Sequence, residues 1–182
     1  MRGGQSFLAE KKVNTKKPKN SRKGNVGDIA LIIVVMFSFA LIVIIGKNVF
    51  VDLNEGMQDA GFMSNRSVSI LDNFESNYTT IFDGIFLFVF VGLIVGVAIS
   101  AFMIKSHPAF FFVTIILLAF FIIIAAIFSN VYEDISTNEA FVDQSADFTV
   151  INHIMGNLPV WITIGGALVL LALYIKSRAE EV

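Results

Sequence analysis

The 182-residue sequence contains no cysteine and little charge. The lack of cysteine excludes disulfide bonds, thiolate metal sites and cysteine nucleophiles. Charged residues make up 15% of the chain, whereas a soluble domain usually carries about 25%. Hydrophobic residues make up 55% and include 19 phenylalanines. These proportions predict that lipid, rather than water, surrounds much of the protein.

Catalytic signatures are also lacking. The sequence has no H-E-x-x-H motif, no P-loop and no paired-carboxylate motif. Its two histidines, His107 and His153, fall on opposite sides of the predicted membrane region and therefore do not form a metal site. The centres of the predicted spans hold no ionisable residue, which disfavours ion-coupled transport and intramembrane proteolysis. We expect no enzymatic activity, no metal and no cofactor.

Four segments are long and apolar enough to cross a bilayer, which requires roughly 20 apolar residues each. Backbone groups in lipid must bond within the segment, so each is expected to be an α-helix. Asp28, Pro108 and Asn157 stand where the first, third and fourth helices should begin. The predicted fold is an all-α, polytopic four-helix membrane domain over residues 28–182, with spans at about 29–51, 84–104, 109–131 and 158–175.

Basic residues, which mark the cytoplasmic side of membrane proteins, are unevenly distributed along the chain. Of the 13 lysines and arginines, eight precede the first span, one lies between spans two and three, and two follow span four. Acidic residues gather in the other two connections. The pattern predicts that both ends of the chain are cytoplasmic. The residues expected at membrane interfaces are Lys47, Lys105, Trp161, Tyr174, Lys176 and Arg178.

Residues 1–27 form a basic segment of low hydrophobicity, which cannot bury enough apolar surface to fold alone. Two roles remain open for this tail. It can rest on anionic lipid headgroups, or it can dock on a protein or nucleic acid. The residues available for either role are Lys11, Lys12, Lys16, Lys17, Lys19, Arg22 and Lys23.

Both predicted outer connections contain short amphipathic patterns. Within residues 52–82, helical spacing of apolar residues predicts a helix on the membrane or leading into span two. Within residues 132–156, Asp147 is positioned to cap a short helix that ends at Gly156. Asp83, at the edge of span two, is interpreted as a structural anchor. Asn65 and Asn77 each begin a glycosylation sequon, which matters only in a eukaryotic secretory protein.

Span two carries small residues at four-residue intervals, which let helix backbones approach closely in membranes. The motif predicts a helix-packing face, either within one chain or between copies, and consists of Gly84, Gly92, Gly96 and Ser100. In span four, Gly165 and Gly166 are expected to serve close packing.

The favoured function is a non-enzymatic structural or assembly component of a membrane, in particular of a membrane-containing virus or phage particle. Expected partners are lipids, other subunits such as a capsid protein or a membrane complex, and nucleic acid through the tail. The expected location is a cell membrane or the internal membrane of a virion. Two alternatives stay open: a holin-like or channel-forming oligomer, and a small transporter or regulatory subunit.

Overall fold

The computed structural model describes residues 27–61, 63–103 and 108–179. These residues form six helices: α1 (Gly27–Asp59), α2 (Asn65–Met103), α3 (Pro108–Ser136), α4 (Val142–Ala146), α5 (Thr149–Gly156) and α6 (Leu158–Ala179). Four of them, α1, α2, α3 and α6, are long and apolar enough to cross a membrane. The all-α fold with four candidate spans, predicted from the sequence, is thereby confirmed.

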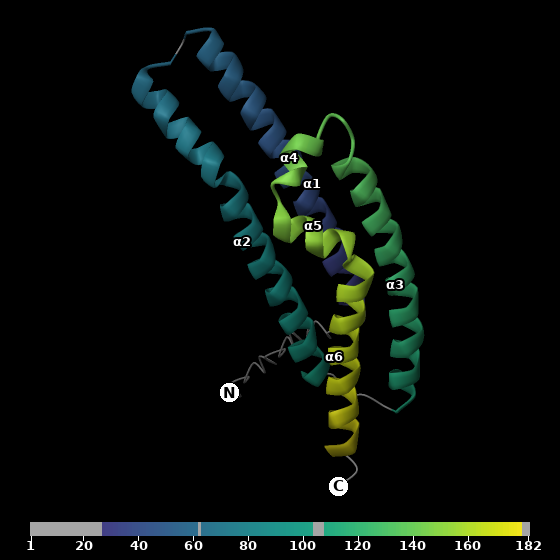
Figure 1. Ribbon diagram of the computed structural model, residues 1–182. Helices are drawn as coiled ribbons and strands as arrows, with labels where there is room; N and C mark the ends of the chain where they lie inside the picture. Colours follow the sequence, from purple (N-terminus) through teal and green to yellow (C-terminus); the bar gives the residue numbers. More distant parts are fainter. Residues whose placement is uncertain (1–26, 62, 104–107, 180–182) are drawn as a thin grey trace, which may run out of the picture.

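The four long helices make a bundle in which α1 and α6 each pack against both α2 and α3 (Figure 1). One end of the molecule carries the α1–α2 turn together with α4 and α5, and the other end carries the end of α6 (Figure 1). We call residues 142–156, which contain α4 and α5, the cap, and name the two ends the cap end and the terminal end. The basic tail and Lys105 lie outside the described residues.

Helices α1 and α2 are longer than the predicted spans. They contain 33 and 39 residues, or about 50 and 58 Å at 1.5 Å per residue, while the hydrocarbon core is about 30 Å thick. The segment expected to be a connection, residues 52–82, is therefore mostly helix. Its amphipathic part does lead into span two, as one of the two stated alternatives had it. Together the two helices form an antiparallel hairpin that extends past the cap (Figure 1).

The turn of this hairpin is built from local signals. Gly61, with φ of 67°, takes the left-handed conformation that ends many helices, and its N–H donates to the carbonyl of Gln58 at 3.0 Å. The hydroxyl of Ser64 accepts from the N–H of Ser67 at 3.3 Å, which caps the start of α2.

The core of the bundle is apolar and is filled mainly by large side chains. Ile33, Met36, Phe86 and Ile151 are fully buried. The rings of Phe37 and Phe128 meet edge to face with centroids 4.7 Å apart, which joins α1 to α3. Between helices that lie in lipid, van der Waals packing of such side chains stabilises the bundle, because lipid is as apolar as the side chains themselves.

Gly166 of α6 lies against Leu118 of α3, so closely that an added methyl group would overlap the leucine. Gly165 faces Ile94 of α2, whose nearest atom is 3.7 Å from an added Cβ. Helix α6 is continuous across both glycines. The expected close packing is therefore confirmed for Gly166, whereas a Cβ at Gly165 would make an ordinary van der Waals contact.

Candidate functional site

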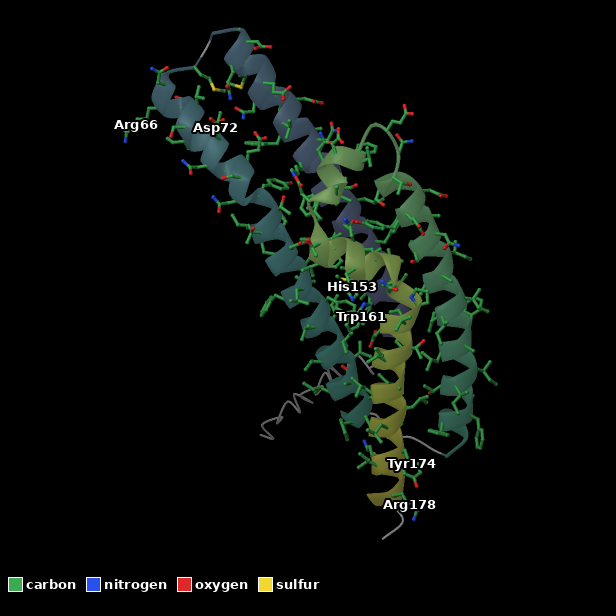
Figure 2. The ribbon with its side chains drawn as sticks, viewed as in Figure 1. Arg66, Asp72, His153, Trp161, Tyr174 and Arg178 are labelled. Carbon is green, nitrogen blue, oxygen red and sulfur yellow. The ribbon has the colours of Figure 1, made fainter. Side chains whose placement is uncertain are left out.

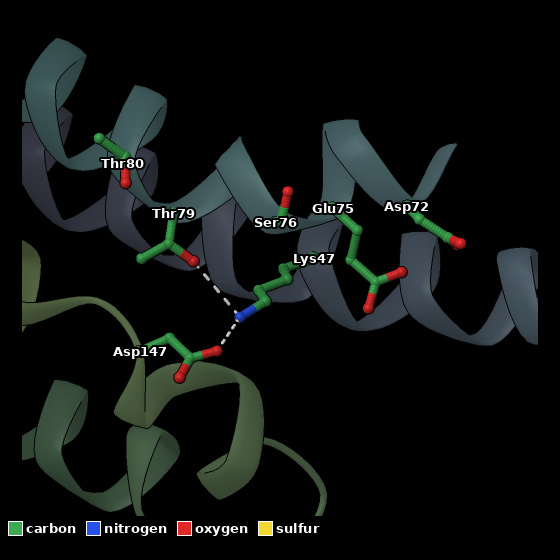
Figure 3. A pocket seen from close by; sticks show the side chains of 7 residues that line it. All are labelled: Lys47, Asp72, Glu75, Ser76, Thr79, Thr80 and Asp147. Atoms are coloured by element: carbon green, nitrogen blue, oxygen red, sulfur yellow. Dashed lines mark hydrogen bonds and ion pairs between the residues drawn. The ribbon is translucent and has the colours of Figure 1, made fainter. Parts of the chain in front are cut away.

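A polar cavity of about 580 Å³ lies at the cap end, between the α1–α2 hairpin and the cap (Figure 3). One residue comes from α1, five come from α2 and one comes from the link between α4 and α5. They are Lys47, Asp72, Glu75, Ser76, Thr79, Thr80 and Asp147. Figure 3 shows the ammonium group of Lys47 pointing between α2 and the cap.

Lys47 is the centre of this arrangement and is only 6% exposed. Its ammonium group forms an ion pair with the carboxylate of Asp147 and lies 3.4 Å from the hydroxyl of Thr79. It also lies 5.4 Å from the centre of the Phe148 ring, within reach of a cation–π interaction. A buried ammonium group needs such partners, because losing its hydration shell is costly.

The sequence placed Lys47 at a membrane interface, and the structure gives it a partner within the protein. Lys47 follows the buried residues Val43 and Ile44 by four and three positions, so it lies on the inward face of α1 and pairs with a carboxylate of the cap. Its place at a membrane interface stays a prediction.

Asp83 holds the start of α5. Its two carboxylate oxygens accept hydrogen bonds from the backbone N–H groups of Val150 and Ile151, each at 3.0 Å. These N–H groups belong to the first turn of α5, where no intrahelical partner exists and where the helix dipole favours negative charge. Asp83 thus fits the predicted role of structural anchor.

The predicted cap of the same helix by Asp147 is wrong. The residue that precedes α5 is Phe148, and it makes no side-chain capping bond. Asp147 instead faces Lys47. The helix itself and its end at Gly156 agree with the prediction, and its apolar side, Phe148, Ile151, Ile154 and Met155, is buried.

Helix α3 holds the end of α5. The hydroxyl of Ser129 donates to the carbonyl groups of Met155 and Gly156 at 2.8 and 2.9 Å. The hydroxyl of Tyr132 donates to the side chain of Asn152 at 2.6 Å. The cap is therefore attached to α1, α2 and α3 at once.

Beyond the cavity, the hairpin carries a second set of polar contacts between α1 and α2. The amide of Asn54 donates to the carboxylate of Glu75 at 2.9 Å, and the amide of Gln58 lies 3.3 Å from the carboxylate of Asp72. Amide groups therefore hold two of the acidic side chains in the cavity wall. The described residues contain no group of His and acidic side chains placed to hold a metal ion.

The small-residue motif of span two does not pack inside the chain. A Cβ added at Gly84, Gly92 or Gly96 would meet no atom within 4 Å. These glycines lie on the exposed side of α2, and Ser100 is half-buried. Of the two predicted uses of the motif, packing within one chain is not what the structure has, and contact between copies stays a prediction.

The predicted interface residues of α6 have specific neighbours (Figure 2). The Trp161 ring is half-buried and lies 5.7 Å from that of Phe90 and 6.1 Å from that of His153. At the terminal end, the ammonium of Lys176 donates to the carbonyl of Phe102 at 2.7 Å. The guanidinium of Arg178 lies 5.7 Å from the centre of the Tyr174 ring.

The sequence did not predict the hydrogen bonds that Ser129, Tyr132 and Asn152 make between α3 and α5. Polar residues near the end of an apolar run usually mark only its boundary. The one residue in the sequence that indicated a polar attachment in this region was Asp83, an isolated carboxylate at the start of span two.

Comparison with family models, with curated proteins and with solved structures gave no match.

Proposed function

We propose that the protein is a non-enzymatic structural or assembly component of a membrane. The observation that carries this proposal is the attachment of the cap: an ion pair from the buried Lys47 to Asp147, a two-oxygen helix cap and three hydrogen bonds to α3 hold it in one position. The polar groups around the cavity bond mainly to one another. Such an arrangement keeps the cap in a fixed position against the long helices.

The proposed orientation places both chain ends in the cytoplasm and the cap end outside. The distribution of basic residues along the sequence supports this orientation: 11 of the 13 lysines and arginines lie before span one, between spans two and three, or after span four, and Lys47 and Arg66 are the two that do not. Among the described residues, Lys176 and Arg178 lie at the terminal end, while the hairpin and the cap carry most of the acids: Asp52, Glu55, Asp59, Asp72, Glu75, Asp143 and Asp147. Basic residues are retained on the cytoplasmic side of membranes.

We infer further that the membrane belongs to a virus or phage particle, either the virion's internal membrane or the cell membrane where the particle assembles. The support is in the sequence: a basic tail suited to docking on a capsid protein or nucleic acid, and a residue composition rich in Phe, Ile and Asn. Deleting residues 1–25 tests this inference. We expect membrane insertion and orientation to persist, because Lys105, Lys176 and Arg178 remain, and incorporation into particles to be lost.

Orientation is tested by labelling, and the lack of native cysteine makes single-cysteine variants clean probes. We expect Ser64→Cys and Asp143→Cys to react with a membrane-impermeant maleimide in intact cells, since both residues are exposed. Ser145, in the same cap, is an unsuitable probe because it is buried and donates to the carbonyl of Ser136 at 2.5 Å. Reaction of Ser64→Cys only after lysis would contradict the proposed orientation.

A second candidate function is a holin-like or channel-forming oligomer, favoured by the exposed glycines of α2. Purified protein in liposomes separates the two functions. The structural proposal expects liposomes to retain a small fluorescent dye at protein densities at which an oligomeric pore would release it. Dye release that grows steeply with protein density would support the oligomeric channel and contradict the structural role.

A further inference from the structure

One side of α2 is exposed along nearly its whole length. The residues on it are spaced alternately four and three apart, which is the seven-residue repeat of coiled coils. They are Ile70, Phe74, Asn77, Ile81, Gly84, Phe88, Val91, Val95, Ala98 and Phe102. All are exposed except Ala98, which is half-buried. We call these ten residues the α2 seam.

The seam continues through two different solvents. Its last six residues fall within the predicted span, where lipid can cover apolar side chains. Its first four precede the span, where α2 carries Asp72 and Glu75 and projects past the membrane. There, Ile70 is 62% exposed and Phe74 is 42% exposed. Large apolar side chains repeated along a face in water mark an interaction surface.

Charge is kept off the seam. The four charged residues of α2, Arg66, Asp72, Glu75 and Asp83, all occupy other positions of the repeat. Like charges therefore do not oppose one another when two copies of the seam meet. The one polar seam residue is Asn77, whose amide donates to the carbonyl of Asn73 in its own helix at 2.7 Å. A single asparagine at a core position of a coiled coil specifies register and the number of strands.

We propose that the α2 seam is the contact between two copies of this chain, packed in parallel about a two-fold axis that runs along the bundle. Copies inserted in one membrane share an orientation, so their α2 helices run parallel. The partner must cover a continuous strip that lies partly in water and partly in lipid, and the same helix of a second copy does so in register. Asn77 then faces Asn77 of the second copy. The inference goes beyond the proposed function and does not depend on it.

The exposed strip offers less area than a standard interface, and neighbouring residues of α1 add to it. Residues 70–102 extend about 48 Å along the helix axis, and a helix is about 10–12 Å wide with its side chains. The strip alone offers on the order of 500–600 Å² per copy, against about 800 Å² in a standard interface. Leu53 and Met57 of α1 are exposed and lie near the seam, because the Phe50 ring between α1 and α2 is 5.1 Å from that of Phe74. They supply additional area.

Disulfide scanning of the full chain in liposomes tests the proposal, since no native cysteine interferes. We expect Phe74→Cys, Asn77→Cys and Ile81→Cys to form dimers under mild oxidation about ten-fold faster than Ser69→Cys and Ser76→Cys, because only facing residues bring Cα atoms within about 7 Å. The two serine controls are exposed but lie on the side of α2 that faces the polar cavities. Equal rates at all five positions, or no dimer at any, would overturn the seam.

Two further experiments distinguish the seam from other ways in which α2 could be covered. If copies met through Gly92 and Gly96 instead, Gly96→Cys would cross-link faster than Val95→Cys, and this result would also overturn the proposal. The double variant Ile70→Ser/Ile81→Ser changes two side chains that are 62% and 45% exposed, so each chain should fold as before. We expect single-molecule counting to show dimers for the natural chain and monomers for this variant. Monomers for both would mean that lipid alone covers the face and would contradict the inference.

Discussion

The cap end and the membrane-spanning part of the bundle are held together in different ways. At the cap end, individual groups meet in fixed geometry: Asp83 with two N–H groups of α5, Lys47 with Asp147, and Ser129 with two carbonyl oxygens. In the spanning part, helices meet through the shape of apolar side chains, as at Phe37 and Phe128 or at Gly166 and Leu118. We therefore expect that substitution of a single polar residue destabilises the attachment of the cap, while a change of side-chain volume destabilises the packing between the long helices.

The largest effect is expected from Asp83→Ala. The change removes two charge-assisted hydrogen bonds, worth about 1.5–3 kcal/mol each, from a buried helix end. We expect a loss of about 3 kcal/mol or more in stability, and rapid hydrogen exchange over residues 149–156. Thermal unfolding in detergent and exchange measured by mass spectrometry check the two parts. Asp143→Ala, which removes an exposed acid of the cap, is the control and should leave both unchanged.

A smaller effect is expected from added volume in the spanning part. Gly166→Ala forces Leu118 to move and should cost about 1–3 kcal/mol through overpacking. Gly96→Ala places a methyl group in open space and should change the stability of the monomer by less than about 0.5 kcal/mol. Detergent melting of both variants tests the contrast. Equal destabilisation by the two changes would mean that the α2 glycines pack inside the chain after all.

Among the destabilising changes, the smallest effect is expected from Asp147→Ala. Breaking a fully buried ion pair costs about 3–5 kcal/mol, but the side chain of Asp147 is 60% exposed and water reaches it. We therefore expect a loss of about 1–2 kcal/mol. The double variant Lys47→Met/Asp147→Ala leaves no unpaired charge and should recover most of the loss. A double variant less stable than Asp147→Ala would show that Lys47 contributes through contacts other than this pair.

The same contrast explains what the sequence allowed one to predict. The four spans follow from runs of apolar residues, which are a local property, and they appear at the predicted places. The extension of α1 beyond its predicted span was missed, and the helix that leads into span two was only one of two stated alternatives, since polar residues such as Asn54 and Glu75 resemble a connection until they are seen bonded to each other. The contacts of the cap with α1 and α2 join residues 67 to 100 positions apart, a separation that local patterns do not reveal.

The attachment of the cap also sets an order of events during synthesis. The side chains of α1, α2 and α3 that bond to the cap, Lys47, Asp83, Ser129 and Tyr132, all precede it in the chain. Because a protein emerges from the ribosome amino end first, these groups have all left the ribosome before α5 leaves it. The cap can therefore dock as soon as it leaves the ribosome, because none of these partners is made after it. Truncation after residue 157 should consequently leave Asp83 able to protect the start of α5.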